Sequence, residues 1–164
     1  MKFDEISKLK KISVKKKIVL CHGVFDIIHS GHIKYFNQAK KLGDILVVSV
    51  TADKFVLKGQ SRPINNLKNR MDVLKNLKMV DYVLESNFPT AEKIIEKIKP
   101  KIYCKGPDYK NKVDNDKRLQ REIKAVKKNN GKFITVIHET LSSSKIIKQA
   151  NLGLNDDKIS KYIK

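Results

Sequence analysis

Apolar residues recur along this chain in two patterns, short continuous runs and longer segments with helical spacing. The runs are typical of strands buried in a parallel sheet, and they lie at 17–22, 45–51, 81–84, 101–104 and 132–137. Apolar positions three or four residues apart predict helices at 3–12, 31–42, 66–77, 89–98 and 116–129, and a last helix over 142–150. Strand and helix alternate throughout, which predicts an α/β fold built as a single domain with a doubly wound parallel sheet.

Glycines fit the predicted ends of two helices. Gly43 follows the segment 31–42, and Asn130-Gly131 follows the segment 116–129. A residue with left-handed backbone commonly ends a helix, and glycine is the usual choice there. We therefore expect both helices to stop at these positions.

The length and composition fit one globular domain. The chain has 164 residues, of which 40% are hydrophobic, enough for one core. We expect the domain to span 1–150, followed by a Lys-rich tail at 151–164. No apolar run approaches the 18 residues of a membrane span, and the first 17 residues lack the apolar stretch of a secretory signal.

The two cysteines, Cys21 and Cys104, lie far apart in the sequence and match no metal-binding spacing. Free cysteine is often a small buried residue. We expect both at strand ends without a redox role, which places the protein in the cytoplasm.

The formal net charge of +19 raises the question of nucleic-acid binding. The positive charge is nearly all lysine, whereas base and phosphate recognition favours the planar fork of arginine. The lysines are also spread over the whole chain. We therefore expect no nucleic-acid partner, although the positive field would speed the encounter with a phosphorylated substrate.

The residues with the clearest chemistry follow the first predicted strand, in the segment Gly23-Val24-Phe25-Asp26-Ile27-Ile28-His29-Ser30-Gly31-His32. Gly23 lets the backbone approach a phosphate closely. Gly31 keeps the start of the next helix open, where free N–H groups and the helix dipole attract an anion. His29 and His32 are three residues apart on one helical face, so both rings can donate hydrogen bonds to phosphates. The segment predicts a site for a phosphorylated ligand.

These residues resemble the His-x-Gly-His motif of the cytidylyltransferase-like nucleotidylyltransferases. The resemblance covers roughly 17–150 and implies a Rossmann-like fold that binds its ligands at the C-terminal ends of the strands. Within this superfamily the chain is most similar to the adenylyltransferase domain of the bifunctional heptose kinase/adenylyltransferases. That similarity implies transfer of AMP from ATP to a heptose-1-phosphate-like sugar, with release of pyrophosphate. Their sugar-kinase domain has no counterpart in this sequence, so the phosphorylated sugar is expected to come from another protein.

Three further segments carry the similarity to the heptose enzymes. They are Lys58-Gly59 with Arg62-Pro63 and Arg70, which resemble the triphosphate-side loop and helix; Lys105-Gly106-Pro107-Asp108-Tyr109, which resembles a Lys-Gly-Gly-Asp-Tyr motif with proline at its third position; and Ser142-Ser143-Ser144, which resembles a Ser-Thr-Thr helix start.

The resemblance implies a role for each of these residues. The expected catalytic residues, which brace the phosphates, are His29, His32, Lys58 and Arg70, and Arg62 is expected to contact substrate. The expected nucleotide contacts are Gly23, Val24, Phe25, Asp26, Gly31, Lys105, Gly106, Asp108, Tyr109, Ser142, Ser143 and Ser144. Asp26 is expected either to orient the motif loop or to reach the metal through water.

The cofactor is expected to be Mg²⁺, which arrives with the triphosphate and is held mainly by phosphate oxygens and water. Two histidines could in principle bind zinc, but no clear carboxylate or cysteine partner accompanies them in the sequence. We therefore expect no metal site formed by protein ligands.

Several alternatives remain open from the sequence. The glycerol-phosphate cytidylyltransferases carry Arg-Thr-Glu-Gly where this chain has His138-Glu139-Thr140-Leu141, which argues against that acceptor. A CTP-dependent enzyme acting on another polyol or an amino-alcohol phosphate is one alternative, and a non-catalytic module binding phosphate or nucleic acid is the other. The loops around 85–90 and 107–116 are expected to shape the acceptor pocket. Related proteins are often dimers, so a homodimer is expected.

Overall fold

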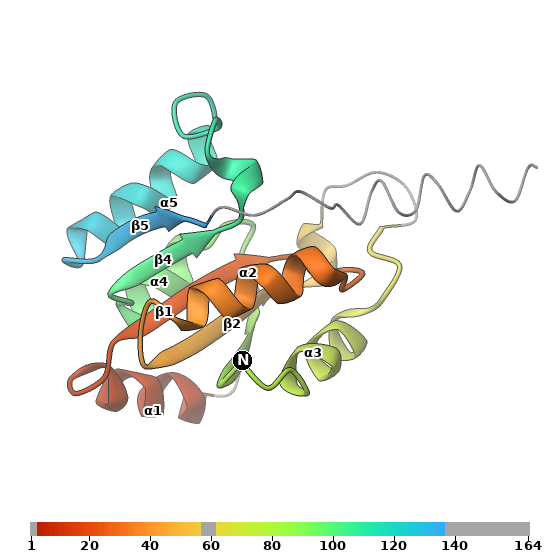
Figure 1. Ribbon diagram of the computed structural model, residues 1–164, viewed down its shortest axis with the longest axis horizontal. Helices are drawn as coiled ribbons and strands as arrows, with labels where there is room; N and C mark the ends of the chain where they lie inside the picture. Colours follow the sequence, from red (N-terminus) through yellow and green to blue (C-terminus); the bar gives the residue numbers. More distant parts are fainter. Residues whose placement is uncertain (1–2, 57–61, 137–164) are drawn as a thin grey trace, which may run out of the picture.

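The computed structural model describes residues 3–56 and 62–136, which form one five-stranded sheet between two layers of helices (Figure 1). The strands are β1 (Ile18–Gly23), β2 (Ile45–Thr51), β3 (Tyr82–Ser86), β4 (Ile102–Lys105) and β5 (Lys132–Thr135). All four pairings are parallel, in the order β3-β2-β1-β4-β5. The strand order therefore reverses between β1 and β4, and ligands of such sheets bind beside that reversal. The predicted α/β fold is confirmed.

Helices cover both faces of the sheet. One face carries α1 (Phe3–Ser13), α4 (Glu92–Ile98) and α5 (Lys117–Lys128), and the other carries α2 (Ser30–Lys40) and α3 (Leu67–Lys75). Figure 1 shows α2 in front of the sheet and α4 behind it. Within the described part of the chain, no helix combines the length and the apolar character that crossing a membrane requires.

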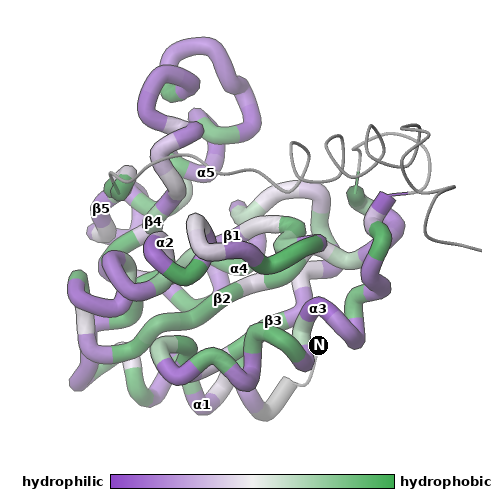
Figure 2. The backbone as a smooth tube through the Cα atoms, turned by 45° about the vertical axis from the view of Figure 1, so that its right-hand side comes forward, coloured by the Kyte–Doolittle hydropathy of each residue, from purple (hydrophilic) through white to green (hydrophobic). Residues whose placement is uncertain are grey.

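Alternate residues of each strand point to opposite helix layers. In β1, Val19 and Cys21 pack with Phe36 of α2, whereas Ile18 and Leu20 pack with the helices of the other layer. Both sides of a central parallel strand are buried, which explains the continuous apolar runs in the sequence. Figure 2 shows this as hydrophobic colour along β1 and β2.

The two cysteines face each other across neighbouring strands. Cys21 of β1 and Cys104 of β4 are register partners, and both are fully buried free thiols. Burial raises the pKa of the Cys21 thiol well above its usual range, with a further contribution from Cys104. They are small buried residues, as expected, but they lie side by side within the strands and not at the strand ends.

The predicted helix ends are partly wrong. Helix α2 ends at Lys40 with Lys41 in right-handed conformation, so Gly43 is not its cap. Gly43 is needed for space, because a Cβ there would lie 2.7 Å from the carbonyl oxygen of Lys17. After α5 it is Asn130 that takes the left-handed conformation, with a φ of 57°.

Other boundaries shift by a few residues. Helix α4 begins at Glu92, three residues later than predicted, and β5 ends at Thr135. Two short 3₁₀ helices, Asp53–Phe55 and Pro107–Tyr109, follow β2 and β4, and the second lies in the segment 107–116 that was expected to be a loop. The predicted last helix over 142–150 and the tail at 151–164 lie outside the described residues.

Candidate active site

The two histidines of the motif stand together at the start of α2. Strand β1 ends at Gly23, and His29 is the N-cap residue of α2, with extended backbone. The ring centroids of His29 and His32 are 4.0 Å apart, and both side chains are half-buried. Gly31 is buried in the same first turn. The arrangement predicted from the spacing is therefore present: two imidazoles beside the N–H groups of a helix N-terminus.

The side chain of Phe25 supports the histidine pair. Its φ is 52°, a left-handed conformation that few residues other than glycine adopt. The buried ring meets His32 edge to face at a centroid distance of 5.5 Å and also packs on Phe36 at 5.2 Å. A Cβ on Gly23 would lie 3.0 Å from the Phe25 ring. In this structure Gly23 leaves room for a side chain that supports His32, a role the sequence did not suggest.

Asp26 is tied to the segment that precedes α3. Its carboxylate accepts hydrogen bonds from the backbone N–H groups of Ile64, at 3.1 Å, and Asn65, at 2.9 Å. The Nε atom of Arg62 lies 3.2 Å from the same carboxylate, and both side chains are nearly buried. Of the two expected roles for Asp26, this geometry favours orientation of the motif loop. Arg62 is turned toward Asp26.

Arg70 lies in the interior, with 1% of its surface exposed. Its Nη2 atom donates to the Thr51 carbonyl at 2.8 Å and to Asp53 at 2.6 Å. Its Nε atom donates to the Asn65 carbonyl at 2.9 Å, and Nη1 donates to the Val24 carbonyl. The guanidinium that was expected to hold a phosphate therefore binds protein oxygens and joins the motif loop, the end of β2 and the start of α3.

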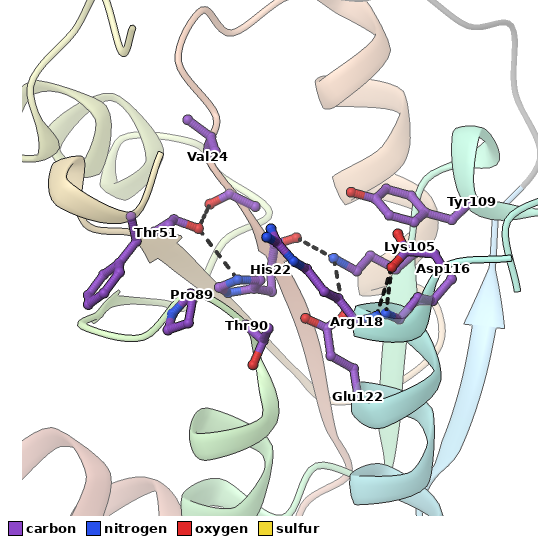
Figure 3. A pocket seen from close by; sticks show the side chains of 13 residues that line it. His22, Val24, Thr51, Pro89, Thr90, Lys105, Tyr109, Asp116, Arg118 and Glu122 are labelled. Atoms are coloured by element: carbon purple, nitrogen blue, oxygen red, sulfur yellow. Dashed lines mark hydrogen bonds and ion pairs between the residues drawn. The ribbon is translucent and has the colours of Figure 1, made fainter. Parts of the chain in front are cut away.

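A polar cavity of about 220 Å³ opens on the α4 and α5 side of the same sheet edge (Figure 3). The strand ends contribute His22, Gly23, Val24, Thr51 and Lys105. The connecting segments and α5 contribute Phe55, Pro89, Thr90, Tyr109, Asp116, Arg118, Leu119 and Glu122. The loops around 85–90 and 107–116, expected to shape the acceptor pocket, thus meet here.

Lys105 is the cation deepest in this cavity. Its Nζ atom donates to the His22 carbonyl at 3.2 Å, lies 3.7 Å from the Glu122 carboxylate, and sits 4.5 Å from the centre of the Tyr109 ring. Only 4% of Lys105 is exposed. Figure 3 shows the lysine amine beside His22, with Tyr109 above it and Glu122 below it. The cavity therefore offers a fixed positive charge to a ligand.

His22 lies beside that charge as a buried base. Burial, and then the positive charge of Lys105, hold the pKa of His22 well below its usual range. Its Nδ1 atom lies 2.7 Å from the Ser49 hydroxyl, and Nε2 lies 3.4 Å from that of Thr51. His22 is thus a neutral ring near pH 7.

Residues 20–149 match a sequence family described as cytidylyltransferase-like. The chain belongs to the cytidylyltransferase-like family. Membership makes it a nucleotidylyltransferase, in agreement with the paired histidines after β1.

Two bacterial proteins are similar to this chain over most of its length. The bifunctional protein HldE of Campylobacter concisus is 39% identical over 157 residues, which cover 94% of this chain and 31% of the relative. HldE of Aliarcobacter butzleri is 43% identical over 137 residues, or 81% of this chain and 29% of the relative. The chain spans about a third of the length of these curated relatives.

Solved structures agree with the fold. The lipopolysaccharide core biosynthesis protein from Thermoplasma volcanium has a TM-score of 0.64 and 30% identity, and the match covers 76% of this chain and 99% of that one. Pantothenate synthetase from Thermus thermophilus has a TM-score of 0.59 at 13% identity, over 86% and 65% of the two chains, and supports the fold alone.

The other residues that were expected in the site either lie away from the cavity or fall outside the described residues. Gly106 and Asp108 follow Lys105 but do not line the cavity, and Asp108 is exposed. Lys58 and Ser142–Ser144 lie outside the described residues. Within residues 3–56 and 62–136, no three His, Cys, Asp or Glu side chains gather as metal ligands.

Several residues that line the cavity were not predicted from the sequence. Glu122 carried a signal, because it interrupts the apolar face that Leu119, Ile123 and Val126 form on α5. His22 carried another, as a polar residue in an otherwise apolar strand. Arg118 and Asp116 gave none, since exposed charges are common in this chain.

Proposed function

We propose that this nucleotidylyltransferase transfers AMP from ATP to a phosphorylated sugar of the heptose 1-phosphate kind and releases pyrophosphate. The observation that carries the proposal is the His29 and His32 pair at the start of α2, together with a small cavity that holds the cation Lys105 and is lined by Gly23 and Val24 of the same motif segment. The HldE relatives, which match 81 to 94% of this chain, support ATP and a sugar phosphate as the substrates.

The chemistry is an in-line displacement at phosphorus. A phosphate oxygen of the acceptor forms a bond to the α-phosphorus of ATP, and the bond from that phosphorus to the bridging oxygen breaks. The bonding electron pair leaves with pyrophosphate. A sugar phosphate is already ionised at neutral pH, so the step needs no general base, and positioning and charge stabilisation provide the catalysis.

In this scheme the imidazoles of His29 and His32 donate to the α-phosphate and to the bridging oxygen of the leaving group. The N–H groups at the start of α2 add positive potential at the same place. Phe25 keeps His32 in position through its edge contact. Arg70 acts as a positioning residue that holds the motif loop, in place of the phosphate contact expected from the sequence.

We assign magnesium to the substrate as Mg–ATP. Magnesium keeps several waters and is commonly bound through phosphate oxygens. The carboxylate of Asp26 is engaged by the backbone of Ile64 and Asn65, which fits a loop-orienting role better than contact with an ion.

We assign the acceptor to the cavity around Lys105. Its volume of about 220 Å³ lies below the range of about 300–1,000 Å³ that is usual for drug-sized ligands, which suits the smaller of the two substrates. Lys105 and Arg118 supply positive charge for the phosphate. Thr51, Thr90 and Asp116 supply hydroxyl and carboxylate groups for sugar hydroxyls.

An amino-alcohol phosphate fits this cavity less well. Recognition of an ammonium group commonly uses an open aromatic face. The ring of Tyr109 already has the Nζ atoms of Lys105 at 4.5 Å and Lys112 at 5.3 Å from its centre. A further cation there would be repelled, which favours an uncharged polyol such as a sugar.

The test is pyrophosphate release from a matrix of triphosphates and acceptors. ATP, CTP, GTP and UTP, each with Mg²⁺, are combined with heptose 1-phosphate, mannose 1-phosphate, glycerol 3-phosphate and phosphocholine. We expect the highest kcat/KM with ATP and a sugar 1-phosphate. Turnover confined to CTP with another acceptor would replace the proposal by its cytidylyltransferase alternative. No turnover, together with steeply salt-dependent binding of duplex DNA, would favour a binding module.

A further inference from the structure

Glu122 is a buried carboxylate on the apolar face of α5. Only 5% of its surface is exposed, and its neighbours on that face are Leu119, Ile123 and Val126. A buried charge needs compensation, because removing it from water costs several kcal/mol. An apolar residue at this position would therefore give a more stable fold, unless a partner compensates the charge.

The carboxylate has three partners, which come from two elements, the start of α4 and strand β4. Oε1 accepts a hydrogen bond from the Ala91 N–H at the start of α4, at 2.8 Å. Oε2 accepts one from the Tyr103 hydroxyl of β4, at 2.7 Å, and lies 3.7 Å from the Nζ atom of Lys105 at the end of β4. Burial, and then the Glu122 charge, raise the pKa of Tyr103 well above its usual range, so its hydroxyl remains a donor.

Two of these contacts need no charge, whereas the third does. Tyr103 and the Ala91 N–H can donate to any neutral acceptor of the right shape. Lys105 is 4% exposed and carries a full positive charge, which requires an anion or strong dipoles nearby. The negative charge of Glu122 therefore serves to balance the positive charge of Lys105.

The spacing leaves the ammonium available to a ligand. At 3.7 Å the Glu122 oxygen is too far for a short hydrogen bond, so it balances the lysine charge without taking up one of its three donors. One donor goes to the His22 carbonyl at 3.2 Å. Figure 3 shows the Lys105 side chain held between Glu122 and His22 at the cavity.

We propose that Glu122 is a positioning residue for the acceptor, which holds the charged Lys105 side chain where it meets the acceptor's phosphate. This inference rests on the proposed function. Glu122 lines the cavity, but both of its carboxylate oxygens are engaged by Ala91, Tyr103 and Lys105, so it acts on the acceptor through Lys105. We expect its effect on the acceptor and not on ATP, because Glu122 lies on α5, whereas the histidine pair begins α2 on the opposite face of the sheet.

The test compares KM values for the two substrates in Glu122→Gln. Glutamine keeps the shape and an acceptor oxygen but removes the charge. We expect the KM for the sugar phosphate to rise about tenfold or more, equivalent to about 1.4 kcal/mol, with the KM for ATP changed less than twofold. Equal changes in both KM values, or no change in either, would overturn the proposal.

Three controls separate charge from packing. Tyr103→Phe removes one hydrogen bond to Glu122 but keeps the ion pair, and Glu96→Gln removes an exposed carboxylate of α4 that pairs with Lys93. Both should keep the wild-type acceptor KM. The double variant Lys105→Gln/Glu122→Gln should equal Lys105→Gln alone, because Glu122 acts through Lys105. Additive effects would contradict the mechanism.

Two further measurements keep the proposal testable if other parts fail. If Glu122→Gln does not fold, Glu122→Asp withdraws the carboxylate by one methylene group and should still raise the acceptor KM; a wild-type KM would overturn the proposal. If the wild type turns over no acceptor, the proposed function fails. Calorimetric binding of inorganic phosphate then decides, with about tenfold weaker binding expected in the Glu122 variant and equal binding as the contradicting result.

Discussion

Replacement of Arg70 by methionine separates two roles for this arginine. The sequence resemblance implies a phosphate ligand, whereas the structure has its guanidinium donating to the carbonyls of Val24, Thr51 and Asn65. Methionine retains much of the side-chain volume and removes the donors. If Arg70 binds phosphate, its replacement raises the KM for ATP and leaves stability unchanged. If Arg70 holds segments of the fold together, its replacement lowers the free energy of unfolding.

The expected loss follows from the contacts. Hydrogen bonds from a charged donor contribute about 1.5–3 kcal/mol each, and three carbonyl acceptors lose such a donor. The ion pair with Asp53 adds little, because 44% of the Asp53 side chain is exposed and solvent screens it. Removing the cation also removes its own desolvation cost, so we expect about 3–5 kcal/mol, the range for breaking a buried charged network.

Urea unfolding followed by circular dichroism measures this loss. Arg121→Met is the matched control, because the Arg121 side chain is 60% exposed and pairs only with Glu92 among the described residues. It should change stability by less than about 1 kcal/mol. A stability loss below about 1 kcal/mol in Arg70→Met, with a large rise in the KM for ATP, would refute the structural role and restore the phosphate contact.

Three other predictions can be tested directly. His32→Ala should lower kcat about 10²–10³-fold with the fold intact, measured by pyrophosphate release, and a wild-type rate would remove the histidine from the mechanism. Because His22 stays neutral when folded but binds a proton near pH 6.5 when unfolded, stability should fall as pH falls below about 6.5. Urea titrations from pH 7.5 to 5 should show less of this loss in His22→Gln, and an identical slope would count against the assignment. For the homodimer, which we propose only from the resemblance to related proteins, light scattering should give twice the 18.8 kDa chain mass, and a monomer mass at all concentrations would reject it.

Local patterns predicted the sheet and the histidine pair well. The apolar runs determine the strands because burial on both faces leaves no polar alternation. His29 and His32 could be paired from their spacing alone, since both belong to one helix start. Their support by Phe25 was not predictable, because it depends on a left-handed backbone at a residue other than glycine.

Contacts between segments that are far apart in the sequence could not be predicted. Arg70 looked like one of four arginines suited to phosphate, and its interior position depends on carbonyls of loops up to 46 residues away. Lys105 meets the His22 carbonyl across 83 residues. A buried carboxylate such as Glu122 can be recognised on its helix as a charge in an apolar face, but its partner is known only once the strands are in place.

The central claim is the identity of the product. One reaction with equal ATP and CTP, Mg²⁺ and heptose 1-phosphate, analysed by mass spectrometry and ³¹P NMR, tests it most directly. We expect pyrophosphate and an ADP-linked sugar as the main products, formed in equal amounts. A CDP-linked product, or pyrophosphate without any nucleotide-linked sugar, would contradict it.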